Sequence, residues 1–290
     1  MSKPIKHHYV SKFYLKNFTK SGGSKEKLFA YDKSKNHYFQ SNPKDICFIK
    51  NFNTISYPGK EYILEHELAK IESDISTSFN NVIGKFAYPN EEQLDHILTF
   101  MTLTALRNPK MRTLFDDFYR QIIDRMMMLT YATEERYLDQ CKQAGIKEED
   151  ILPYEKQKAF VMDKSRYTID INHEVHIENE LKTVEMLIEL LHNRKWHLIV
   201  SNDLHGKFIT SDYPVSLTSQ IDRGPYGVGF GLPQTEVTFP ISKSLALIGT
   251  FEDLNPQKII FATPALVNEL NLRTFNAANK QVFSTSKIIY

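Results

Sequence analysis

Two adjacent histidines near the start of the chain, His7 and His8, carry the most versatile side chains for chemistry. An imidazole acts as a general base, a general acid or a metal ligand near neutral pH. Because adjacent residues of a strand point to opposite faces, we expect at most one of the pair to reach a given site. The alternative is a pair of packing histidines whose rings bond the backbone, and the sequence leaves both interpretations open.

A second candidate is the segment Thr210-Ser211-Asp212, which ends an apolar run just before Pro214. Hydroxyl and carboxylate groups at the end of a strand hold a cation, accept a hydrogen bond from a substrate hydroxyl or orient a histidine. The same residue types also form turns that stop a strand by bonding the backbone. Both interpretations stay open.

Arg107 follows a largely apolar helical segment and stands two residues before Pro109. A single arginine on such a face binds a phosphate or carboxylate through two parallel hydrogen bonds. It also binds the carbonyl groups that are left unpaired at the end of a helix. The two interpretations carry equal weight.

Glu65 and Glu72 are seven residues apart, which places them two turns apart on one face of a helix. Carboxylates on one face bind Mg²⁺ or Mn²⁺, although such a row is more often a solvated surface. His173 and His176 form a further pair of candidate ligands, but they lack the spacing and the third ligand of the zinc-protease motif. A divalent cation such as Mg²⁺ or Mn²⁺ is therefore an expected cofactor class whose ligands the sequence does not define.

Fragments along nearly the whole chain resemble one bacterial family, domain of unknown function 4238. Its opening motif, His-His-Tyr-Val-Pro-x-x-Tyr-Leu-x-x-Phe, is similar to residues 7–18, where Ser11 replaces the usual proline. Its Leu-Glu-x-x-Leu-Ala-x-Ile-Glu, Arg-Thr-Pro-x-x-Arg and Phe-x-Thr-Ser-Asp-x-Pro-Val motifs look like residues 64–72, 107–112 and 208–215. Shorter matches lie at residues 31–32, 51–53, 196, 239–242 and 271.

The resemblance implies a bacterial origin and indicates which residues are candidates for a functional site, but it implies no reaction. It favours His8 over His7, because the family's motif usually keeps His8. We therefore expect a catalytic set of His8, Arg107 and Asp212. The neighbouring residues of the same motifs are expected to bind substrate, and these are His7, Tyr14, Thr210 and Ser211.

The elements that must position these residues follow from the apolar periodicity. Short strands are predicted in the first sixty residues, including a hairpin of residues 28–31 and 37–39. Helices are predicted from residue 61 to about residue 193, because apolar side chains recur there every three or four positions. One of these helices carries Leu114, Phe118, Ile122 and Met126 and extends toward Cys141.

Strands are predicted again after Trp196, with a hairpin of residues 196–200 and 207–210. Further strands are expected within residues 215–218, 235–239, 245–249, 258–261 and 281–284, and the Gly-rich stretch 224–231 is the expected mobile loop. Thr263 and Pro264 predict the start of a last helix. This order indicates an α+β fold with N-terminal short strands, a central helical block and C-terminal antiparallel strands with a final helix. We expect a single domain over residues 1–290, with the helical subregion at about 61–193.

Composition narrows the class of protein without naming a reaction. The 290 residues carry 36 Lys and Arg against 35 Asp and Glu, so no overall charge steers the chain toward nucleic acid or an acidic membrane. The two cysteines are far apart, which argues against a disulfide scaffold. The N-terminal residues lack the apolar core of a signal peptide, and no segment is apolar enough to cross a membrane, so a cytoplasmic protein is expected.

Two hypotheses about function follow from these residues. In the first, the protein is a hydrolase or transferase that acts on a phosphate-containing substrate, a nucleotide or nucleic acid. Small stand-alone bacterial proteins of this kind often serve as toxins or phage-defence effectors, which adds an association but no physical argument. In the second, the chain is a non-catalytic module that binds a protein or a small ligand. The sequence indicates no oligomeric state.

Overall fold

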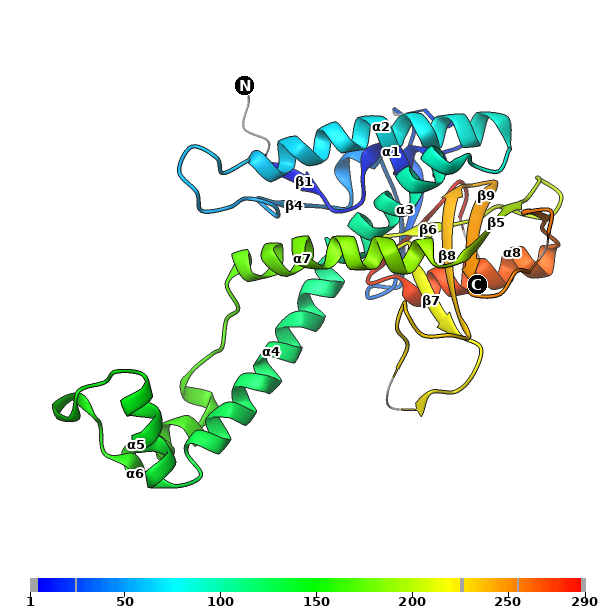
Figure 1. Cartoon of the computed structure of the whole chain (residues 1–290). Coiled ribbons are helices and arrows are strands. Elements are labelled where there is room, and N and C mark those ends of the chain that lie inside the picture. Colours follow the sequence, from blue (N-terminus) through cyan, green and yellow to red (C-terminus); the bar gives the residue numbers. More distant parts are fainter. Residues whose placement is uncertain (1–4, 24, 225–226, 255, 288–290) are drawn as a thin grey trace. The chain divides into compact units, whose positions relative to one another are not determined.

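The computed structural model describes residues 5–23, 25–224, 227–254 and 256–287. The chain divides into two compact units, which are described separately below. The first unit combines Met1–Lys110 with Ile177–Tyr290, and the second unit is Met111–His176. Figure 1 shows the elements of both units in order along the chain.

The N-terminal strands of the first unit belong to two sheets. β1 (Lys6–His8) pairs antiparallel with β4 (Phe48–Lys50). The predicted hairpin is confirmed, because β2 (Leu28–Asp32) and β3 (His37–Ser41) pair with Tyr31 opposite Tyr38. The final strand β11 (Gln281–Ser284) lies between β2 and the two-residue β6 (Thr210–Ser211), which gives the sheet order β3-β2-β11-β6.

A five-stranded sheet forms the other β layer, in the order β10-β5-β9-β8-β7. Its strands are β5 (Lys195–Val200), β7 (Ser216–Ser219), β8 (Thr235–Ser242), β9 (Leu245–Thr250) and β10 (Ile259–Phe261). β10 runs parallel to β5, whereas the other neighbours are antiparallel.

The predicted hairpin of residues 196–200 and 207–210 is wrong. β5 pairs instead with β9 and β10, because its nearly continuous apolar run is buried on both faces and needs a strand on each side. Phe208 lies outside the strands, and its backbone amide donates to the carbonyl of Lys243 at 2.8 Å. Of this segment, only Thr210 joins a strand, β6.

Helices cover these sheets and supply much of the core. α2 (Ile63–Lys85) is followed by α3 (Glu91–Leu106), which begins with a capping box between Asn90 and Gln93. α7 (His173–His192) precedes β5, and α8 (Pro264–Ala277) begins at Thr263, whose hydroxyl accepts from the amide of Leu266 as the sequence predicts. The short helix α1 (Lys12–Leu15) places Tyr14 in the interior.

Aromatic rings form the centre of the first unit. Tyr14 stacks on Phe239 with ring centroids 5.3 Å apart, and Phe79 contacts Phe100 edge to face at 5.2 Å. These rings come from α1, β8, α2 and α3, so the core joins the N-terminal motif to both the helices and the large sheet. The fold is therefore α+β, with short N-terminal strands, central helices and C-terminal strands that enclose the last helix.

The second unit is helical. α4 (Pro109–Thr130) enters it, and α5 (Glu134–Gln143) and α6 (Tyr154–Met162) follow. The helix that was expected to extend toward Cys141 ends at Thr130, and Cys141 lies on α5. Across the described part of the chain, no helix combines the length and the apolar character that crossing a membrane requires. Pro225 and Tyr226 of the predicted mobile loop lie outside the described residues.

Candidate functional site

The two histidines of β1 occupy different surroundings, as the alternation of a strand predicts. His7 is fully buried, and its Nδ1 accepts a hydrogen bond of 2.9 Å from the backbone amide of Asn53. The same nitrogen lies 3.7 Å from a carboxylate oxygen of Glu65, which in turn accepts from the side-chain amide of Asn53 at 2.8 Å. His7 is therefore part of an internal network with two other motif residues.

His8 is half-buried on the other side of the strand. Its Nε2 lies 3.3 Å from the carbonyl oxygen of Lys44, to which it donates in the matching tautomer. The pKa of His8 is lowered to about 4, first by burial and then by the positive charge of Lys12, while the hydrogen bond to the Lys44 carbonyl opposes the fall. The imidazole is thus neutral at physiological pH.

Glu72 lies among groups from three other parts of the chain. Its Oε1 accepts a hydrogen bond of 2.5 Å from the hydroxyl of Ser11. Burial raises the pKa of Glu72, whereas the Ser11 hydroxyl and then the charge of Arg107 lower it, and the charge of Glu65 raises it. Lys12 also lowers it, so its ammonium group is within electrostatic range of both Glu72 and His8. A carboxyl with a raised pKa is suited to proton transfer.

Arg107 closes α3 as its C-cap residue, with its backbone amide donating to the carbonyl of Leu103 at 3.0 Å. Only 6% of the residue is exposed. Its positive charge lowers the pKa of Glu72. The arginine therefore lies at the end of its helix, as the sequence predicts, and acts electrostatically on the second carboxylate of the α2 row.

Asp212 is buried and its carboxylate is already engaged by the backbone. Oδ1 accepts from the amide of Asn279 at 2.8 Å, and Oδ2 accepts from the amides of Lys280 and Gln281 at 2.8 and 3.0 Å. Burial raises the pKa of Asp212, and these three donors oppose the rise. The carboxylate of Asp212, just after β6, thus binds the backbone at the start of β11. A role as metal ligand or histidine orienter stays a prediction that these contacts do not favour.

The expected substrate-binding residues have internal partners as well. The Tyr14 hydroxyl donates to the carbonyl of Pro240 and lies 2.7 Å from the hydroxyl oxygen of Thr210. Ser211 accepts from the amide of Tyr213 at 3.1 Å. Tyr14, Thr210 and Ser211 are all fully buried, so contact with a substrate stays a prediction for each of them.

The structure thus brings several of the motifs into contact. Tyr14 meets Thr210 directly, and the side chain of Asn108, next to Arg107, meets the backbone of Asp212 at 2.8 Å. Lys12 lowers the pKa of both His8 and Glu72, and Arg107 lowers that of Glu72, so electrostatic effects connect His8 with Arg107 through Lys12 and Glu72. A site built on these observations therefore centres on Glu72 rather than on Asp212.

Sequence patterns point only weakly to this centre. For the pair of Glu65 and Glu72 a solvated row is the more frequent interpretation, and no motif points to Lys12. Ser11 stands out only as a departure from the family's proline. The spacing of Glu65 and Glu72 was the available signal, since it places both side chains on the face of α2 that meets β1 and Arg107.

Metal ligands are not gathered in the described residues, where no group of three or more His, Cys, Asp or Glu side chains is arranged around a common point. His176 instead lies 2.9 Å from the carboxylate of Asp116, and His173 lies 3.3 Å from the guanidinium of Arg112. The expected Mg²⁺ or Mn²⁺ therefore gains no defined ligand set.

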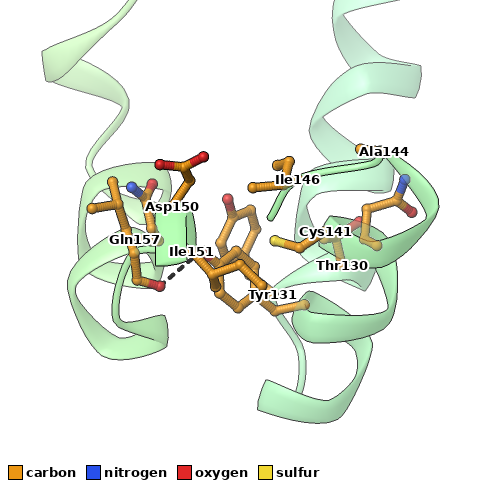
Figure 2. A pocket seen from close by; sticks show the side chains of 11 residues that line it. Thr130, Tyr131, Cys141, Ala144, Ile146, Asp150, Ile151 and Gln157 are labelled. Atoms are coloured by element: carbon orange, nitrogen blue, oxygen red, sulfur yellow. Dashed lines mark hydrogen bonds between the residues drawn. The ribbon is translucent and has the colours of Figure 1, made fainter. Parts of the chain in front are cut away.

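The second unit contains a hollow of about 270 Å³ between the end of α4, α5 and α6. The rings of Tyr131 and Tyr137 lie 5.3 Å apart beside it. Figure 2 shows Cys141 and Ile146 on one side of this hollow and Asp150 on the other. Its lining belongs to the second unit and includes none of the residues that were expected to form a site.

Comparison with known proteins gives the chain a family. The sequence profile of the family described as protein of unknown function (DUF4238) matches residues 6–288. The chain belongs to this family. The matched range contains every motif on which the resemblance rested, so that expectation is confirmed. No curated protein and no solved structure matches the chain.

Proposed function

We propose that Glu72, Arg107, Lys12 and His8 form the active site of an enzyme that acts on a phosphate-containing substrate, a nucleotide or nucleic acid. The observation that carries the proposal is the position of Glu72, a partly buried carboxyl that accepts from the Ser11 hydroxyl at 2.5 Å and on whose pKa both Arg107 and Lys12 act. A carboxyl of this kind next to a fixed cation combines proton transfer with anion binding.

Each residue has a defined part in this proposal. Arg107 and Lys12 bind the phosphate oxygens. The negative charge of the bound phosphate then offsets the effect of the Arg107 charge on Glu72. Glu72 transfers the proton at the reacting oxygen, in a hydrolysis or group transfer. His8, neutral because its pKa is lowered to about 4, contributes an uncharged hydrogen-bonding ring at β1 rather than a base. A toxin or phage-defence role is part of the same proposal.

The experiment compares purified variants on nucleotides, RNA, DNA and simple phosphodiesters. We expect Glu72→Gln to lower kcat at least about 100-fold. Arg107→Ala should raise KM. Glu67→Gln is the matched control, because Glu67 lies on the same helix but is exposed and pairs with Lys70 at its surface, so the activity should not change. Equal activity of Glu72→Gln and the wild type, or no turnover of any of these substrates, would overturn the proposal.

The second candidate function is a non-catalytic binding module. It is supported by Asp212, whose three backbone hydrogen bonds and burial give it a purely internal task. The buried pair of Tyr14 and Thr210 supports it in the same way. On this proposal, nucleotides or phosphate raise the Tm of the wild type without being consumed, and Arg107→Ala removes that rise.

A further inference from the structure

Helix α4 carries a polar stripe and an apolar stripe on opposite sides. Arg112, Asp116, Arg120 and Asp124 follow one another at four-residue intervals, and Leu114, Phe118, Ile122 and Met126 do the same two positions further on. Two positions correspond to about 200° around a helix, so the stripes lie on opposite sides. In a water-soluble helix the apolar stripe normally packs against the protein.

The polar stripe is the one that packs within the unit. The segment that joins α6 to α7 (Figure 1) and the first turn of α7 supply its partners. Arg120 donates to the carbonyl of Ile169 at 3.0 Å, and Asp124 pairs with Lys164 at 2.5 Å. The contacts of Arg112 with His173 and of Asp116 with His176 complete the row.

The apolar stripe is therefore left toward solvent. Phe118 is 56% exposed and Met126 61% exposed, and Leu114, Ile122 and Leu129 are exposed as well. These five side chains leave on the order of 450 Å² of apolar surface on one helix. A contiguous apolar patch of this size equals the largest patch of a typical monomeric protein, and such a patch is often functional.

We propose that the apolar stripe of α4 is the interface with a second copy of this chain, in which two α4 helices pack antiparallel about a two-fold axis near Gln121. Asp117, Gln121 and Arg125 follow one edge of the stripe at four-residue intervals. An axis at Gln121 places Asp117 of each copy opposite Arg125 of the other, because both lie about 6 Å from it along the helix. The edge of the stripe in one copy is thus complementary in charge to the same edge in the other copy.

The area of the apolar stripe and the charges of α4 favour a second copy of the chain over a membrane surface. A symmetric pair of such faces buries roughly 1,000 Å² once the polar edges are included, which reaches the lower limit for a specific interface. A membrane surface fits less well, because helices that bind anionic lipids carry an excess of Lys and Arg. From Met111 onward, α4 carries three Arg and three Asp, so it has no such excess.

The test is the molar mass of the full chain by sedimentation velocity over a range of concentrations. We expect a dimer, and Phe118→Glu should raise its dissociation constant at least about 30-fold. Phe261→Glu is the matched control, since Phe261 is 78% exposed but lies on β10. A monomer at every concentration, or a dimer that responds equally to both variants, would overturn the proposal.

A charge exchange tests the antiparallel register. Asp117→Arg and Arg125→Asp each place like charges opposite one another and should weaken the dimer, whereas the double variant restores opposite charges and should recover most of the affinity. Asp117 also lies 3.5 Å from Arg120 within its own helix, so circular dichroism must confirm that each variant is folded. A double variant as weak as the single variants would rule out this register.

Discussion

The side-chain amide of Asn108 donates a hydrogen bond of 2.8 Å to the backbone carbonyl of Asp212, 104 positions further along the chain. Asn108 is fully buried, and its Oδ1 also accepts from the amide of Lys110 at the start of α4. One side chain therefore joins the motif at the end of α3 to the motif at β6 while capping the next helix.

Asn108→Ala should lower the free energy of unfolding by about 2–3 kcal/mol, because it removes a helix cap and leaves a buried carbonyl unpaired. Asn108→Thr keeps a side-chain oxygen that can cap the helix and should cost about half as much. Urea denaturation measures both variants. Equal stability of the alanine and threonine variants would show that the cap contributes nothing.

Asp212→Asn should destabilise the protein by about 3 kcal/mol. The amide has only one oxygen for the backbone donors of Asn279, Lys280 and Gln281, and its NH₂ group faces at least one of them. Asp203→Asn is the control, since the Asp203 side chain is 85% exposed and should change the stability little. If Asp212→Asn unfolds at the wild-type urea concentration but abolishes activity, the residue is functional rather than structural.

The lowered pKa of His8 makes stability depend on pH between about 4 and 6.5. In this window the unfolded chain binds a proton at His8 and the folded chain does not, so the stability rises with pH up to about 6.5 and is lost as the pH falls toward 4. His8→Asn should flatten this part of the curve of Tm against pH. Parallel curves for the variant and the wild type would contradict the burial of His8 as described.

The pKa shift of Glu72 has the opposite effect on the pH dependence of stability. Its pKa is raised in the folded state, so its ionisation weakens folding as the pH rises above the ordinary carboxyl range, and protonation at lower pH relieves that cost. Glu72→Gln removes the charge and should be at least as stable as the wild type at neutral pH. Chemical denaturation at pH 5 and pH 7 measures the difference. A variant that is less stable at pH 7 than at pH 5, relative to wild type, would show that the Arg107–Glu72 attraction dominates.

Gly249→Ala should destabilise the large sheet by about 1–3 kcal/mol. A β-carbon at this position would lie 2.7 Å from ring atoms of Trp196, which is buried and donates from its indole to the carbonyl of Leu191. Gly84→Ala on α2 is the control, because its added methyl group meets nothing within 4 Å and should stabilise the helix by up to about 1 kcal/mol. Thermal unfolding of the two variants should therefore shift in opposite directions.

The sequence by itself determined the elements whose signals are local. The apolar periods located α2 and α3, Thr263 with Pro264 located the start of α8, and the short run of residues 281–284 around Val282 and Phe283 located β11. The motifs also determined the family. These features depend on residues within one or two turns of each other, so no knowledge of distant contacts was needed.

Only the tertiary structure decided what each element faces. Strand partners are chosen over long separations, which is why β5 pairs with β9 and β10 rather than with residues 207–210. Asp212 finds its donors near Asn279, and Glu72 finds Ser11 and Arg107, across distances that no periodicity reports. The spacing in α4 likewise revealed an apolar face but not that the face is exposed, because a period records which side of a helix is apolar and not what covers it.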